Sequence, residues 1–126
     1  MTAIKETSVI QENKQYALDI CPVTYVMEKI GNYWKPIILY HLSKGPIRYS
    51  EIKRAIPAIT EKVLIQHLKQ LESDGLVIRK AKPVVPPYVT YMLSKSGKGL
   101  MPVIDAMASW AINERAKEGK QEVTKQ

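Results

Sequence analysis

Apolar and polar residues alternate with helical periodicity between Thr60 and Gly75. One face of the predicted helix is apolar and carries, at i, i+4 and i+7, Leu64, Leu68 and Leu71. The opposite face carries amide, ammonium and hydroxyl groups, those of Lys62, Gln66, Lys69, Gln70 and Ser73. Thr60 is suited to cap the first turn, and Gly75 to end the last one. The pattern predicts an amphipathic helix with one dry face and one face of hydrogen-bond donors.

Shorter apolar patterns precede this helix. Helical spacing predicts one helix from Pro22 to Ile30 and another from Trp34 to Ser43. Ser50 is expected to cap a short helix from Glu51 to Ile56, and Pro57 to stiffen the turn that follows. Two short helices joined by a few residues, the second with a polar outer face, indicate a helix-turn-helix motif.

The period changes after Gly75. Residues 76–80 and 88–93 are rich in β-branched and aromatic side chains and predict two strands. Residues 81–87 contain three prolines, which cannot continue a β-ladder, so they should form a loop. A hairpin directly after a helix-turn-helix predicts the wing of a winged helix. Residues 47–49 are too short for more than a bridging strand.

The last periodic segment runs from Ser94 to Lys117, and Pro102 predicts a kink or a restart within it. Its apolar stripe and that of the first helix exceed what a small domain can cover, which favours a homodimer. Burial in the core of one chain is the alternative for any single residue. The predicted dimer interface comprises Val23, Val26, Met27, Ile30, Leu100, Val103, Ile104, Met107 and Trp110.

The predicted fold class is α+β and mostly α: a winged helix-turn-helix with a two-stranded wing and N- and C-terminal dimerisation helices. Residues 1–20 are polar with weak periodicity and are expected to form an N-terminal arm. Residues 21–117 should form the winged domain. Residues 118–126, rich in Lys, Glu and Gln, are expected to be a disordered tail.

Lysine and arginine total 19 against 12 acidic residues, which gives a formal charge of +7. This excess favours nucleic acid over a membrane as the partner, because no basic run adjoins a long apolar segment. No stretch approaches the roughly 18 apolar residues of a membrane-spanning helix. The single cysteine excludes an internal disulfide framework and suits a reducing compartment. These features predict a cytoplasmic protein.

The basic residues gather on the predicted helix-turn-helix and wing. The polar face of the helix after Thr60 would read bases in the major groove, and Thr60 would bind a phosphate. Basic residues of the preceding helix and of the wing would hold the DNA backbone. The candidate DNA-binding residues are Arg48, Lys53, Arg54, Thr60, Lys62, Gln66, Lys69, Gln70, Arg79, Lys80 and Lys82. A two-fold dimer predicts an inverted-repeat operator in double-stranded DNA.

An enzyme is not expected, because no nucleophile, base and stabiliser converge: His41 and His67 lie on different predicted helices, far from Cys21. No Cys/His spacing suggests a metal, no glycine-rich run suggests a cofactor, and the sequence identifies no effector. Two alternatives stay open. The polar face is that of an ordinary surface helix, or the winged helix binds RNA or protein without binding an operator.

Four segments of the chain resemble the HxlR-type winged-helix regulators, a bacterial family. They are CPVTYVMEKIGNYWKPIILYHL at 21–42, GPIRYSEIKRAIPAIT at 45–60, LxxLESDGLV at 68–77 and PxxVxYxLSxxGxxL at 86–100. The resemblance implies a homodimeric transcription factor that dimerises through its first and last helices. The chain departs from the family pattern at Ala58, at Thr90 and at Asn32-Tyr33, and the last departure can alter what that turn contacts.

The resemblance also implies a role for Cys21, because in several relatives a cysteine just before the first helix senses electrophiles or oxidants. A thiol at a helix N-terminus lies in positive potential, which stabilises the thiolate and lowers its pKa. Capping by a small thiol, or a disulfide to the same residue of the other subunit, would then shift the dimer geometry. The alternative is a small buried hydrophobic residue.

Overall fold

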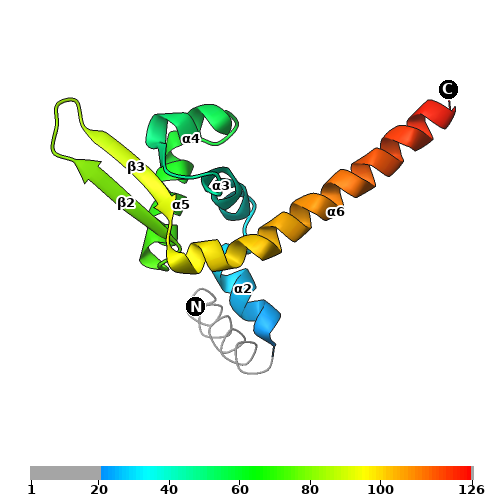
Figure 1. Cartoon of the computed structure of the whole chain (residues 1–126), viewed down its shortest axis with the longest axis horizontal. Coiled ribbons are helices and arrows are strands. Elements are labelled where there is room, and N and C mark those ends of the chain that lie inside the picture. The colour runs from blue at the N-terminus through cyan, green and yellow to red at the C-terminus, as the bar shows by residue number, and fades with distance from the viewer. Residues whose placement is uncertain (1–20, 126) are drawn as a thin grey trace, which may run out of the picture.

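The computed structural model describes residues 21–125, with side chains as far as Gly119. In chain order the elements are α2 (Pro22–Ile30), α3 (Trp34–Leu42), β1 (Ile47–Arg48), α4 (Tyr49–Ala55), α5 (Glu61–Ser73), β2 (Val77–Lys82), β3 (Tyr88–Leu93) and α6 (Lys95–Lys125) (Figure 1). Over this range the chain is a mostly helical α+β winged helix-turn-helix, with five helices and one three-stranded sheet. The predicted N-terminal arm, residues 1–20, lies outside the described residues.

The core forms where α3, α4 and α5 meet. The three leucines of the predicted apolar stripe of α5 are at most 1% exposed, so that prediction is confirmed. They pack with side chains from the other two helices and from the turn before α5, namely Ile38, Leu39, Leu42, Ile52 and Ile59. Burying each of these large aliphatic side chains stabilises the fold by about 1.5–3 kcal/mol. The core therefore fixes which face of α5 remains outside.

The sheet is antiparallel in the order β1-β3-β2. Strands β2 and β3 pair from Val77 opposite Leu93 to Lys82 opposite Tyr88, which confirms the predicted hairpin and extends its first strand to Lys82. Strand β1 also pairs with β3, which confirms the short bridging strand predicted at residues 47–49 and adds a third strand to the sheet beside the two-stranded wing.

The start of α4 differs from the prediction. The helix begins at Tyr49, and Arg48 occupies the N-cap position without a side-chain hydrogen bond, so the expected cap by Ser50 is wrong. The physical reason is the pairing of β1 with β3. That pairing holds residues 47–48 extended, and helix begins at the first residue beyond it.

Helix α6 is uninterrupted across Pro102, so the predicted restart there is wrong. Pro102 is exposed, and so is Lys98, the residue four positions earlier whose carbonyl loses its helical hydrogen bond. The helix projects beyond the rest of the domain (Figure 1) and continues to Lys125, where a disordered tail was predicted from Glu118. Within residues 21–125, no helix has the combined length and apolarity needed to cross a membrane.

Candidate nucleic-acid interface

Helix α5 presents its polar face to solvent. The Thr60 Oγ1 accepts a hydrogen bond from the Val63 backbone N–H at 3.2 Å and caps the helix, as predicted. The exposed side chains of this face are Lys62, Gln66, Lys69 and Gln70, and no acidic residue lies between the first and the last of them. We call these four residues the donor face of α5. The core stripe on the opposite side holds this face outward.

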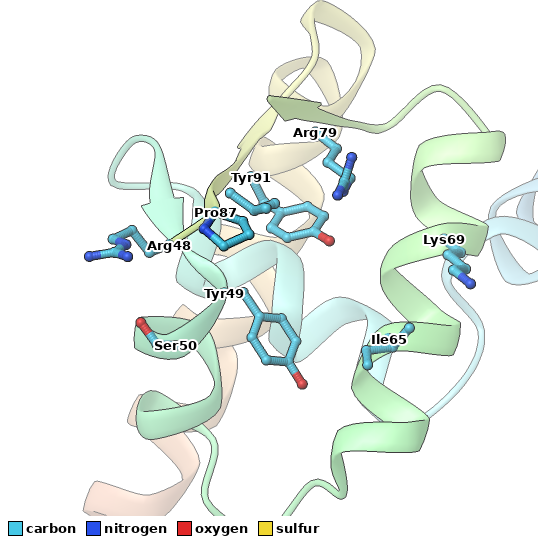
Figure 2. A pocket seen from close by; sticks show the side chains of 9 residues that line it. Arg48, Tyr49, Ser50, Ile65, Lys69, Arg79, Pro87 and Tyr91 are labelled. Atoms are coloured by element: carbon cyan, nitrogen blue, oxygen red, sulfur yellow. The ribbon is translucent and has the colours of Figure 1, made fainter. Parts of the chain in front are cut away.

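The wing divides its basic residues between its two faces. Arg79 and Lys80 are neighbours on β2, so their side chains point to opposite sides of the sheet. Arg79 lies toward α5, as Figure 2 shows. On the other face the Lys82 Nζ lies 5.1 Å from the centroid of the Tyr88 ring, and the Arg48 Cζ lies 4.1 Å from it. The structure thus groups Arg79 with the donor face. It places Lys80, which pairs with Thr90, on the opposite face with Arg48 and Lys82, the two cations that lie by Tyr88.

The two basic residues of α4 differ in their contacts. Lys53 is half-buried, and its Nζ donates to the Pro57 carbonyl oxygen at 3.4 Å. This bond ties α4 to the turn that leads into α5, so Lys53 already has an intramolecular role. Arg54 is exposed beside it.

A turn between α2 and α3 contacts the donor-bearing helix. The Asn32 Oδ1 accepts hydrogen bonds from the backbone N–H groups of Trp34 and Lys35, each at 2.9 Å, and so caps α3. The Asn32 Nδ2 lies 3.5 Å from the His67 Nε2 of α5. At the C-cap of α5, the Lys29 Nζ lies 3.5 Å from Asp74 Oδ1. Helix α2 and its following turn therefore contact α5 at two places, which the sequence did not predict.

Cys21 is exposed at the N-cap of α2. Hydrogen bonding by the backbone N–H of Thr24, then by its hydroxyl and by the N–H of Val23, lowers the pKa of the Cys21 thiol below its usual value. Two of these donors are backbone N–H groups in the first turn of α2, so the direction agrees with the expectation from the sequence. The buried alternative for Cys21 is wrong.

The predicted dimer residues separate into two groups. Ile30 and Ile104 are 4% exposed in the core of the single chain, and Val26 and Leu100 are half-buried against that core. The remainder are exposed: Val23, Met27, Val103, Met107 and Trp110. Two further exposed apolar residues, Tyr25 and Ile112, were not in the predicted set. We call these seven residues the apolar surface of α2 and α6.

A cavity of about 410 Å³ lies between α5 and the wing. It joins two of the predicted DNA-binding residues, Lys69 and Arg79, to apolar side chains that the sequence analysis did not single out, among them Tyr49, Ile65 and Tyr91 (Figure 2). The only signal in the sequence was the alternation along β3, which places Val89 and Tyr91 on one face. Ile65 falls between the core stripe and the donor face of α5, so periodicity did not assign it.

Known proteins resemble this chain over most of its described length. The family model described as HxlR-like helix-turn-helix matches residues 29–119. The uncharacterized HTH-type transcriptional regulator YtcD of Bacillus subtilis is 42% identical over 102 residues, which cover 81% of this chain and 79% of the relative.

Two solved structures of redox-studied regulators are also similar. The redox regulator HypR in its oxidized form superposes with a TM-score of 0.71 at 39% identity, covering 74% of this chain and 96% of HypR. The reduced form of the transcriptional regulator YodB from Bacillus subtilis gives a TM-score of 0.64 at 35% identity, covering 73% of this chain and 91% of YodB.

Proposed function

Because this chain belongs to the HxlR-like helix-turn-helix family of transcriptional regulators, we propose that it binds a specific operator in duplex DNA as a homodimer. The observation that carries this proposal is the donor face of α5, which is exposed, free of acidic residues and flanked by Arg79 of the wing. Gln66 and Gln70 would read base edges in the major groove, and Lys62 and Lys69 would contact bases or phosphates.

The remaining basic residues suit the DNA backbone. Arg48, Lys80 and Lys82 lie on the outer face of the wing, where they would meet phosphates or an adjacent minor groove. Arg54 would contact phosphate from α4, and Thr60 would do so from the start of α5. Lys53 would contribute less, because its ammonium group already binds the Pro57 carbonyl.

A gel-shift titration on the upstream region of the protein's own gene tests operator binding. The variant Gln66→Ala should weaken binding by about 1–3 kcal/mol and reduce the preference over unrelated duplex. Lys62→Gln should weaken binding to the operator and to unrelated duplex alike. Lys117→Gln removes the same charge from the projecting part of α6 and should change neither affinity. Equal loss in the two lysine variants would mean that net charge alone drives binding.

RNA or protein binding without an operator is the alternative. Competition at matched salt decides between them: the labelled duplex is displaced either by unlabelled duplex or by structured RNA. Displacement by RNA at lower concentration than by duplex, with no preferred duplex among genomic fragments, would overturn operator binding.

A second function, control by oxidation at Cys21, is favoured by the exposure of this thiol and its lowered pKa. In the proposed reaction, two Cys21 thiols of a dimer lose two protons and two electrons to form a disulfide, and diamide accepts them to become the hydrazine. HypR is described as a redox regulator with an oxidized and a reduced form, which supports redox control here. Diamide should release wild-type protein from DNA but not Cys21→Ser. Release of both proteins would assign the effect to another group.

A further inference from the structure

The cavity between α5 and the wing has an apolar interior. Tyr49 from α4, Ile65 from α5 and Tyr91 from β3 line it, and Figure 2 shows Tyr49 and Ile65 facing each other across the space. The Tyr49 hydroxyl is buried without a hydrogen-bond partner in the described part of the chain. Burial, followed by the charge of Glu61 and the influence of Tyr91, raises the pKa of that hydroxyl. Flat rings and a branched aliphatic side chain make walls that suit a planar apolar ligand.

The charges at the cavity are all positive. Lys69 and Arg79 line it, and neither forms a salt bridge with any described residue. Arg48 also lines it, but in Figure 2 its guanidinium points away from the interior, and it lies over the Tyr88 ring. No aspartate or glutamate is among the lining residues.

The residues along α5 place a negative charge beyond one end of the cavity and a positive charge at the other end. Glu61, Ile65 and Lys69 follow one another at intervals of four residues, which corresponds to about 6 Å per step along the helix axis. The negative charge of Glu61 therefore lies beyond the apolar wall, and the positive charge of Lys69 lies at its other end with Arg79. An anionic group would be repelled from the first end and attracted to the second.

We propose that this cavity binds a small aromatic anion, with its ring between Tyr49, Ile65 and Tyr91 and its acidic group between Lys69 and Arg79. The volume of about 410 Å³ lies within the range of roughly 300–1,000 Å³ found for small-molecule sites. Two exposed cations without acidic partners provide charge-assisted hydrogen bonds to a carboxylate.

The same ligand would compete with DNA. This step rests on the proposed function, because it requires Lys69 and Arg79 to contact DNA. A carboxylate held between them would offset one of the two positive charges, engage both side chains and occupy the space next to the donor face. When ligand and DNA exclude each other, the apparent dissociation constant for DNA is multiplied by a factor. That factor is one plus the ratio of the ligand concentration to the dissociation constant of the ligand.

The first experiment needs no DNA. The ¹⁵N-labelled full chain is titrated with 2-naphthoate and followed by two-dimensional NMR, with 2-naphthalenemethanol as the neutral analogue. Saturable shifts should centre on the amides of Ile65, Arg79 and Tyr91, and the neutral analogue should bind at least about tenfold more weakly. Shifts confined to the apolar surface of α2 and α6, or equal binding of the two compounds, would overturn the proposal.

Variants locate the site. Arg79→Gln should weaken 2-naphthoate binding by about fivefold or more, whereas Lys80→Gln, the same charge change on the opposite face of the wing, should stay within about twofold. Ile65→Trp should fill the cavity and abolish binding, and thermal unfolding verifies that each variant is folded. Equal losses in Arg79→Gln and Lys80→Gln would show attraction to net charge rather than a site.

A final titration tests competition. With 2-naphthoate at ten times its dissociation constant, the apparent dissociation constant for duplex DNA should rise about tenfold. Site-specific 2-naphthoate binding with unchanged DNA affinity would overturn the competition step. Absence of DNA binding under all conditions would instead count against the proposed function, since the NMR titration is independent of it.

Discussion

At the scale of single residues, Gly97 and Gly99 lie in the same stretch of α6 but in different surroundings. A Cβ added at Gly97 would overlap the carbonyl oxygen of Leu76, whereas one added at Gly99 would meet nothing within 4 Å. Gly97→Ala should therefore destabilise the fold by about 1–3 kcal/mol, because backbone must move to relieve the overlap. Gly99→Ala should stabilise the fold by about 0.4–1 kcal/mol, because alanine lowers the conformational entropy of the unfolded chain. Urea unfolding measures both, and equal effects would contradict the close packing of α6 on the sheet.

Cys21 gives a prediction for pH dependence. Its thiol pKa is lowered, first by the Thr24 backbone N–H, so the thiolate is more populated in the folded chain than in the unfolded one. Any stabilisation from this group is present above the unfolded pKa, about 8.5, and is lost as the pH falls through the lower folded pKa. The rate of alkylation by iodoacetamide should accordingly have its midpoint at lower pH in native than in urea-unfolded protein. Equal midpoints in native and unfolded protein would contradict the lowering of the Cys21 pKa by the start of α2.

At the scale of elements, the position of α5 depends on its first turn. Thr60→Ala removes the acceptor for the Val63 N–H and should cost about 0.5–2 kcal/mol of unfolding free energy. Thr60→Ser retains the hydroxyl and should cost less. Chemical denaturation of the two variants measures the cap, and a loss from Thr60→Ser as large as that from Thr60→Ala would mean that the methyl group matters instead.

The same helix has one polar contact to α2, Lys29–Asp74, and one to the turn between α2 and α3, Asn32–His67. Both are exposed and weak individually, since surface pairs contribute about 0–1 kcal/mol. Their importance lies in position: they join the helix that begins next to Cys21, and the turn that follows it, to the helix that carries the donor face. A change in the orientation of α2 would therefore act on α5 directly.

At the scale of the whole molecule, α6 is longer than the domain that it packs on. Met101 and Ile104 are buried, and the same helical stripe continues through half-buried Ala108 to Ile112, which is 65% exposed. The stripe loses its cover where the helix leaves the body of the domain (Figure 1). A second copy of the chain, supplying its own α2 and α6, is the partner proposed for this surface.

Two substitutions in α6 of the full chain test the dimer. Met107→Glu would place a carboxylate in the proposed interface and should raise the dimer dissociation constant by more than about tenfold. Ser109→Glu adds the same charge on a different side of the helix and should leave it nearly unchanged. Sedimentation equilibrium measures both constants, and a wild-type chain that remains monomeric would remove the proposed interface altogether.

The sequence by itself determined the elements whose signals are local. The helices from Pro22 and Trp34, the apolar stripe and Thr60 cap of α5, and the proline loop between two strands all followed from spacing and from turn chemistry. The donor face followed as well, because an amphipathic helix that buries its apolar stripe turns its polar face to solvent.

Only the tertiary structure decided features that need two distant segments. The pairing of β1 with β3 fixed where α4 begins, and the packing of α6 on the domain separated buried Ile104 from exposed Ile112, although both are apolar residues of one helix. The contact between Asn32 and His67, and the cavity that brings Ile65 to Tyr91, arise from residues far apart in the chain. Periodicity records which face of an element is apolar, but it contains no information on which other segment meets that face.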